Sequence, residues 1–191
     1  MAVTRLTTNG LSGTKYDIAS ADNYYMEPIA TTLLGSAAAN VTFSNIPQNY
    51  KHLQIRYIVR STQAATETGI NARLNSDTGS NYAWHYLFGD GASVAAGAGA
   101  TQTSINLVNV AGNSATASAF AVGVLDVLDY ANTNKYKTLR LLQGWDGNGA
   151  GRVNFSSGLW MNTSPNSTIE LYPSSGNWAA NSRFSLFGIK G

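Results

Sequence analysis

The tripeptide Asp-Thr-Gly at residues 77–79 is the part of the sequence that most suggests catalysis. Aspartic proteases hold a catalytic carboxylate in this tripeptide, and two such carboxylates share one proton across a twofold axis. There the Asp follows two apolar residues of a buried strand, whereas Asn75 and Ser76 precede Asp77 in this chain, which has no second Asp-Thr-Gly. An Asp side chain caps turns, and a glycine tolerates a positive φ. We therefore predict a hairpin turn here and not a protease site.

The other residues with metal or hydrolytic chemistry lack a recognisable spacing. His52 and His85 are the only histidines, and a zinc site needs three or four ligands. The segments 88–92 and 145–151 offer Asp and Asn oxygens to Ca²⁺, but neither follows the EF-hand pattern, so we interpret them as hairpin turns. No pair of the ten acidic residues is placed by sequence for glycoside hydrolysis. We predict no catalytic residue, no metal site and no cofactor, and therefore a protein that is not an enzyme.

Aromatic residues in turn-rich segments are the candidates for binding. Trp and Tyr side chains among Asn, Ser and Gly are typical of surfaces that bind sugars or proteins. The candidates for surface or receptor contacts are Trp178, Trp145, Trp84 and Tyr82. Trp178 is the best of them, because its neighbours in "SSGNWAANS" are all small or polar. The alternative, that these rings close the ends of a hydrophobic core, remains open.

Composition sets the class of protein that must position these residues. The 191 residues suit one domain, or one domain plus an arm, and only 12% of them are charged, against a usual fraction of about 25%. The net charge of +2 is spread along the chain without a basic cluster, so we expect no binding to nucleic acid. Cysteine is absent, no 18-residue apolar run predicts a membrane span, and the first residues show no signal-peptide pattern.

Alternation of apolar and polar residues predicts strands through most of the chain. In residues 50–60 and 69–75 the two kinds of side chain alternate with period 2, which is typical of an antiparallel strand with one wet face. The apolar run 117–130 reads as a strand buried on both faces. The complete set of predicted strands is 50–60, 69–75, 82–88, 103–110, 117–130, 136–145, 152–161, 167–173 and 183–190. We predict an all-β fold, an antiparallel β-sandwich of jelly-roll-like type.

Two segments lack this alternation. Residues 1–39 show no sustained period, so we predict an extended N-terminal arm that serves attachment or oligomerisation, followed by a β-sandwich domain over 40–191. One short strand or turn is expected within the arm near Tyr24 to Ile29. Residues 92–100 are almost entirely Gly, Ala and Ser, and we predict a loop there.

Several segments together resemble a family. They are "VTFSNIPQNYKHLQIRYIVRS" (41–61), "NSDTGSNYAWHYLFGDG" (75–91), "LDYANTNKYKTLR" (128–140), "SSGLWMN" (156–162) and "FSLFGIKG" (184–191). They resemble a group of small virion structural proteins of tailed bacteriophages, particularly those of marine and cyanobacterial hosts. The resemblance covers about residues 41–191 and implies a structural role in the virion, with no catalytic residues to transfer.

These observations lead to two expected functions. The first is a capsid decoration (cement) protein on the outer surface of the particle, made in the bacterial cytoplasm, anchored to the major capsid protein and assembled as a homo-oligomer, most simply a trimer. The second is the head domain of a tail fibre or other appendage that contacts a tail protein and binds a host-surface receptor or glycan. Neither function requires contact with nucleic acid or a membrane.

Overall fold

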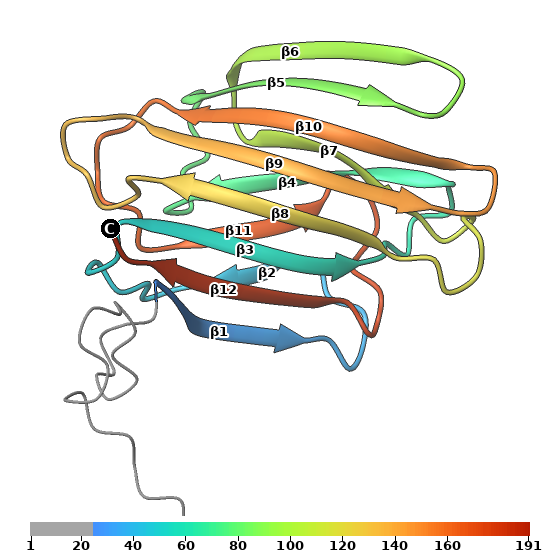
Figure 1. Cartoon of the computed structure of the whole chain (residues 1–191), viewed down its shortest axis with the longest axis horizontal. Coiled ribbons are helices and arrows are strands. Elements are labelled where there is room, and N and C mark those ends of the chain that lie inside the picture. The colour runs from blue at the N-terminus through green and yellow to red at the C-terminus, as the bar shows by residue number, and fades with distance from the viewer. Residues whose placement is uncertain (1–24) are drawn as a thin grey trace, which may run out of the picture.

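Residues 25–191 are described by a computed structural model, in which two antiparallel sheets pack face to face (Figure 1). The larger sheet has eight strands, in the order β1 (Met26–Leu33), β12 (Arg183–Ile189), β3 (His52–Val59), β8 (Ala121–Leu128), β9 (Lys137–Asp146), β10 (Gly151–Trp160), β5 (Tyr82–Gly89) and β6 (Val94–Gln102). The smaller sheet has four, in the order β2 (Val41–Phe43), β11 (Ile169–Pro173), β4 (Glu67–Leu74) and β7 (Ile105–Ala111). The predicted all-β sandwich is confirmed. In the smaller sheet, strands from both halves of the chain interleave, as they do in jelly rolls.

The core lies between the sheets and is built from the alternating positions. In β3, Leu53, Ile55, Tyr57 and Val59 are buried, while the residues between them face outward. Strand β9 alternates in the same way over its ten residues. Because successive side chains of a strand point to opposite faces, one apolar row per strand is enough to fill the space between two sheets.

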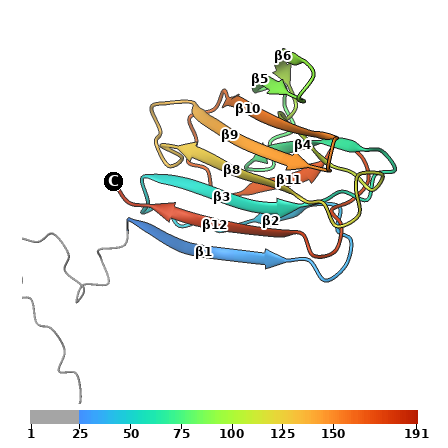
Figure 2. The same cartoon turned by 45° about the vertical axis from the view of Figure 1, so that its right-hand side comes forward.

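Two segments complete the larger sheet at its edges, one expected only as a short strand or turn near Tyr24 to Ile29 and the other expected as a loop. Residues 26–33 form β1, which pairs with β12, so the expected boundary at residue 39 does not separate an arm from the sandwich. Residues 1–24 of that arm lie outside the described residues. The predicted loop 92–100 is wrong, because most of it belongs to β6, which pairs with β5. In Figures 1 and 2, β5 and β6 extend beyond the smaller sheet.

The turn at Asp77 connects the two sheets and is not a hairpin. Strand β4 belongs to the smaller sheet and β5 to the larger one, so they do not pair with each other. The prediction of a turn is confirmed, since Asn75 and Ser76 have positive φ angles of 49° and 53°. The prediction that it joins two paired strands is wrong. Within the part of the chain described here, no helix is long and apolar enough to cross a membrane.

Candidate interaction surface

The face of the eight-stranded sheet that points away from the smaller sheet is unusually apolar. Figure 1 looks onto this sheet. Among the side chains on this face, Leu142 is 59% exposed and Val153 is 64% exposed. We define the apolar face as Ile58, Leu87, Val94, Val122, Val124, Leu142, Val153 and Phe155. Exposed apolar residues are ordinary when they are scattered, but a contiguous patch marks an interaction site.

Strand register shows that these residues are contiguous. They form two neighbouring rows that run across the strands. The first row is Val124, Leu142, Phe155 and Leu87, on β8, β9, β10 and β5, and on β3 it ends at the exposed cation Arg56. The second row is Ile58, Val122, Gly144, Val153, Gly89 and Val94, on β3, β8, β9, β10, β5 and β6. Six adjacent strands therefore contribute to one apolar surface.

A shallow hollow of about 460 Å³ lies in the middle of the apolar face. Its lining includes Gly123, Leu142 and Gly144 from the adjacent strands β8 and β9. Since a glycine has no side chain, the surface above Gly144 is low while the neighbouring Leu142 rises above it. A Cβ atom added at Gly144 would find its nearest atom, the carbonyl oxygen of Arg152, at 3.4 Å. The hollow is therefore open to an incoming side chain.

Opposite charges lie along strand β9 on the two sides of the apolar rows. On one side, Arg140 binds the Asp126 carboxylate across a distance of 2.7 Å, and its own side chain remains 58% exposed. On the other side lies Asp146, whose Oδ1 accepts the backbone N–H of Asn148 at 2.8 Å. Along β9 the outward-facing order is therefore a cation, Leu142, Gly144 and an anion.

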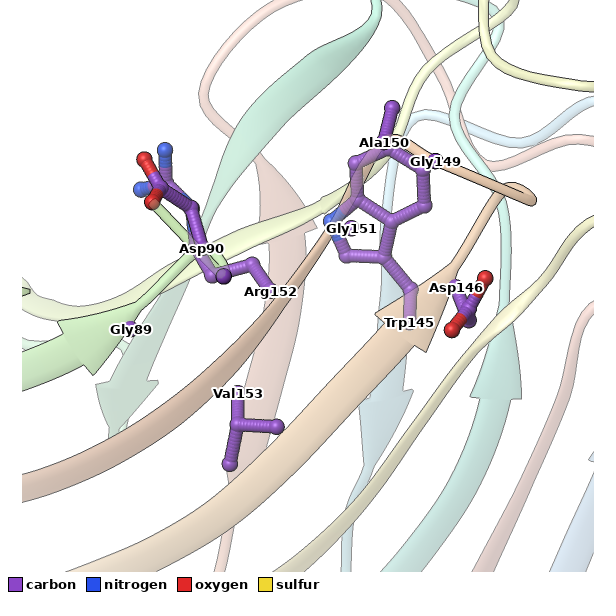
Figure 3. Close-up of a pocket in the computed structure, with 10 residues that line it drawn as sticks. Gly89, Asp90, Trp145, Asp146, Gly149, Ala150, Gly151, Arg152 and Val153 are labelled. Atoms are coloured by element: carbon purple, nitrogen blue, oxygen red, sulfur yellow. The ribbon is translucent and has the colours of Figure 1, made fainter. Parts of the chain in front are cut away.

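The two turns considered for Ca²⁺ lie at this acidic end of the face. Figure 3 shows Asp90 and Asp146 around one hollow of about 240 Å³, with Arg152 and Trp145 in its lining. The Asp90 carboxylate already accepts the N–H groups of Ser93 and Ala92, and these bonds hold the pKa of Asp90 below its ordinary value. Among residues 25–191, no group of three or more His, Cys, Asp and Glu side chains is arranged to hold a metal ion.

The predicted surface role of three aromatic residues is wrong. Trp178 and Tyr82 are fully buried, and Trp145 is 7% exposed. The Trp178 indole donates a hydrogen bond to the Leu171 carbonyl at 3.0 Å and packs edge-on against Phe184 at 5.2 Å. Gly176, with a φ of 72°, lets the backbone turn just before Trp178, and the ring belongs to the hydrophobic core. The alternative of core-closing rings is therefore confirmed for these three residues.

Trp84, the fourth predicted residue, is partly buried and belongs to an aromatic strip. Trp84, Tyr86 and Phe88 are alternate residues of β5, with the first two rings stacked at 5.5 Å and 13° and the next pair at 6.1 Å. Gly99 and Gly97 of β6 lie beneath Trp84 and Tyr86, where an added Cβ would come within 2.5 and 2.6 Å of the rings. We call these three aromatic residues the β5 strip.

Asp77 has a structural environment that explains why it is present. Its carboxylate accepts hydrogen bonds from the Trp160 indole at 2.7 Å, from the Asn81 amide at 2.9 Å and from the Gly79 N–H at 2.8 Å. The bond from Trp160 is the largest influence that holds the pKa of the Asp77 carboxyl below its ordinary value. Oδ2 of this carboxylate thus fastens the turn to the sheet through Trp160, while Oδ1 holds the turn itself through Gly79.

The apolar face itself was not predicted from the sequence. The sequence feature that could have indicated this face is the apolar run 117–130, which was interpreted as a strand buried on both faces. That interpretation is wrong, because Val122, Val124 and Leu128 of β8 are exposed on the outer face while Leu125 is buried. When a strand has apolar residues on both faces and the protein packs against only one of them, the other face is available to a partner.

Comparison with known proteins gives no family. No protein-family model and no curated protein matches the chain. Among solved structures, the crystal structure of galectin LEC-6 from Caenorhabditis elegans is similar over 84% of this chain and 96% of that one. The sequence identity is 9% and the TM-score is 0.33, a likeness too distant to bear on what this chain binds.

Proposed function

We propose that this chain is a non-enzymatic structural protein of a tailed-phage virion that works by binding other protein surfaces. The observation that carries the proposal is the apolar face, which leaves two rows of apolar side chains in water across six strands. Removing such a surface from water is favourable and drives protein association. The virion context rests on the family resemblance of residues 41–191.

The role that we favour in the virion is capsid decoration. A decoration protein binds the assembled shell and not the free subunits, so it stabilises the shell by mass action. It would act on the outer surface of the particle, with the major capsid protein as its partner. The described part of the chain is a β-sandwich of paired strands, which supports a protein that sits on a surface more than one that forms a shaft.

The copy number in purified particles tests the proposal. Quantitative mass spectrometry of the phage that encodes this chain should find hundreds of copies per particle, in a fixed ratio to the major capsid protein. Particles that lack the chain should lose their DNA at a lower temperature. A few dozen copies or fewer would move the protein to the tail, and absence from purified particles would refute a structural role.

A second candidate function is supported by the β5 strip. A tail-appendage domain that binds a host-surface glycan needs aromatic faces that a sugar ring can cover. Trp84 and Tyr86 are both partly exposed and stacked on each other. If this function holds, Trp84→Ala should abolish adsorption to host cells, whereas Tyr136→Ala, at an exposed tyrosine outside the strip, should not. Equal adsorption by both variants would exclude the strip as a receptor site.

A further inference from the structure

We infer that the apolar face is covered by a second copy of this chain, in a face-to-face pair related by a twofold axis that runs across the strands. This inference rests on the proposed role of the face as an assembly interface and names what covers it. Three features of the face support it, namely its relief, its charges and its size.

The relief of the face is complementary to itself on β9 and β5, while on β8 and β10 the apolar side chains of the two rows meet each other. Consider a twofold axis that lies between the two rows and crosses β9 at Gln143. Rotation about this axis places the first row of one copy over the second row of the other, as in any isologous interface. Leu142 then meets Gly144 of the second copy, and Leu87 meets Gly89. In both cases a large side chain lies opposite a residue that has none.

The hollow above Gly144 has room for the leucine that this arrangement brings. Its volume is about 460 Å³, whereas a cavity of about 150 Å³ already accepts a ligand as large as benzene. Because the arrangement is symmetric, each copy contributes one Leu142 and one hollow. Two such insertions exclude water from the centre of the face.

The charges favour this axis over the alternative. With the axis across the strands, Arg140 of one copy lies opposite Asp146 of the other, since both are outward-facing residues of β9 equally far from Gln143. With an axis along β9 instead, Arg140 would face Arg140 and Asp146 would face Asp146. Like charges placed opposite each other across an interface are unfavourable, so the first axis is selected.

The size of the face suits a stable pair. Six strands span five spacings, or about 24 Å, and the six residue steps from Arg140 to Asp146 span about 20 Å. This is roughly 500 Å² per copy, or about 1,000 Å² for the pair, the area that a specific interface should reach. The twofold pair replaces the trimer expected from the sequence, because one self-complementary face is satisfied by one other copy.

Sedimentation velocity on the purified full-length chain tests the inference. The wild type should sediment as a dimer with a Kd of about 1 μM or tighter. Gly144→Leu should raise this Kd at least tenfold, because it fills the hollow that Leu142 of the partner enters. Its monomer should remain as stable as the wild type, since the added Cβ would meet its nearest atoms at ordinary contact distances of 3.4 and 3.9 Å. Leu142→Thr, which removes the inserted side chain, should have the same effect by an independent route.

A matched control and a charge pair complete the test. Thr138→Leu adds the same side chain to an exposed position of β9 outside the two rows, and should leave the Kd unchanged. Arg140→Gln should weaken the pair, whereas an axis along β9 predicts that it tightens the pair by removing a repulsion. A wild type that stays monomeric at high concentration, a trimer, or equal effects of Gly144→Leu and Thr138→Leu would overturn the inference.

Sedimentation velocity and the copy number per particle together separate this inference from the proposed function. If the chain is monomeric in solution and is nevertheless present in hundreds of copies per particle, the twofold pair is wrong and the structural role stands. If the chain forms the predicted dimer but is absent from purified particles, the pair is correct and the virion role is wrong.

Discussion

Replacing Asp77 with alanine tests whether this residue fastens a turn or performs chemistry. Asp77→Ala removes the acceptor of three hydrogen bonds, one of them from the indole of Trp160, whose side chain is 1% exposed. A buried donor left without a partner costs about 1–3 kcal/mol, and the lost hydrogen bonds to Asn81 and Gly79 add about 1 kcal/mol. We therefore expect the free energy of unfolding to fall by about 2–4 kcal/mol, which lowers the Tm by about 5–15 °C in a domain of this size.

Urea unfolding followed by tryptophan fluorescence measures this loss. Asp90→Ala is the matched control, because Asp90 caps a turn in the same way but binds only exposed groups. Its loss should be clearly smaller than that of Asp77→Ala. If the two variants unfold at the same urea concentration, the bond to Trp160 does not stabilise the fold and this reasoning is refuted.

The pH dependence gives a second measurement on the same residue. Because the folded state lowers the pKa of the Asp77 carboxyl below 3.8, its contribution to stability is complete above this pH. It is lost as the pH falls below 3.8 through the lowered folded-state value. The difference in stability between wild type and Asp77→Asn should shrink over this acid range. A protease would instead show acid-dependent peptide cleavage that Asp77→Asn abolishes without unfolding the protein.

Three further predictions concern other parts of the sandwich. Trp178→Ala should lower the free energy of unfolding by about 3–5 kcal/mol in chemical denaturation, because the ring is fully buried; a loss below 1 kcal/mol would contradict this packing. Asp129→Asn should remove a source of acid sensitivity. The hydrogen bond from Lys135, followed by the one from Lys51 and the charges of both lysines, lowers the pKa of Asp129 from 3.8 to about 2. The wild type should therefore be more stable than Asp129→Asn above pH 3.8, and this difference in stability should disappear as the pH falls through about 2. Circular dichroism at a series of pH values checks this, and an advantage that persists at pH 1 would refute it. Gly99→Val should displace Trp84, since its Cβ would lie 2.5 Å from the ring, and near-ultraviolet circular dichroism should change; an unchanged spectrum would show that β6 moves away instead.

The strands that the sequence predicted most accurately are those in which polar and apolar residues alternate. Residues 50–60 and 136–145 match β3 and β9 closely, because one face of each strand is packed in the core. Strand β6 was missed because alanine and glycine carry little β-propensity, and its strand state comes from pairing with β5. Strand β1 was expected only as a short strand or turn near Tyr24 to Ile29, because an edge strand with few buried positions leaves a weak pattern in its sequence.

The interaction surface was harder to predict than the fold, for a physical reason. Polar neighbours in sequence do not determine whether an aromatic ring is exposed, because the cover comes from residues far away in the chain. The Trp178 ring is enclosed by Leu171 and Phe184, while its backbone pairs with Ala38 and Ser61. The apolar face likewise becomes visible only when the register aligns residues from six strands. The alternation of residues within one strand indicates which face is packed in the core. It does not indicate what contacts the opposite face.

The position of β12 in the larger sheet has a consequence for synthesis on the ribosome. This strand pairs with β1 on one side and with β3 on the other, and Arg60, next to the end of β3, bonds Ser182, 122 residues later. While the chain is growing, β1 and β3 have no strand between them, and the β3 edge is free to pair with other chains. The sheet cannot be completed until β12 has been synthesised, so folding of this domain must finish late and through distant contacts. A ribosome that stalls before residue 183 would hold a nascent chain with an open, aggregation-prone sheet.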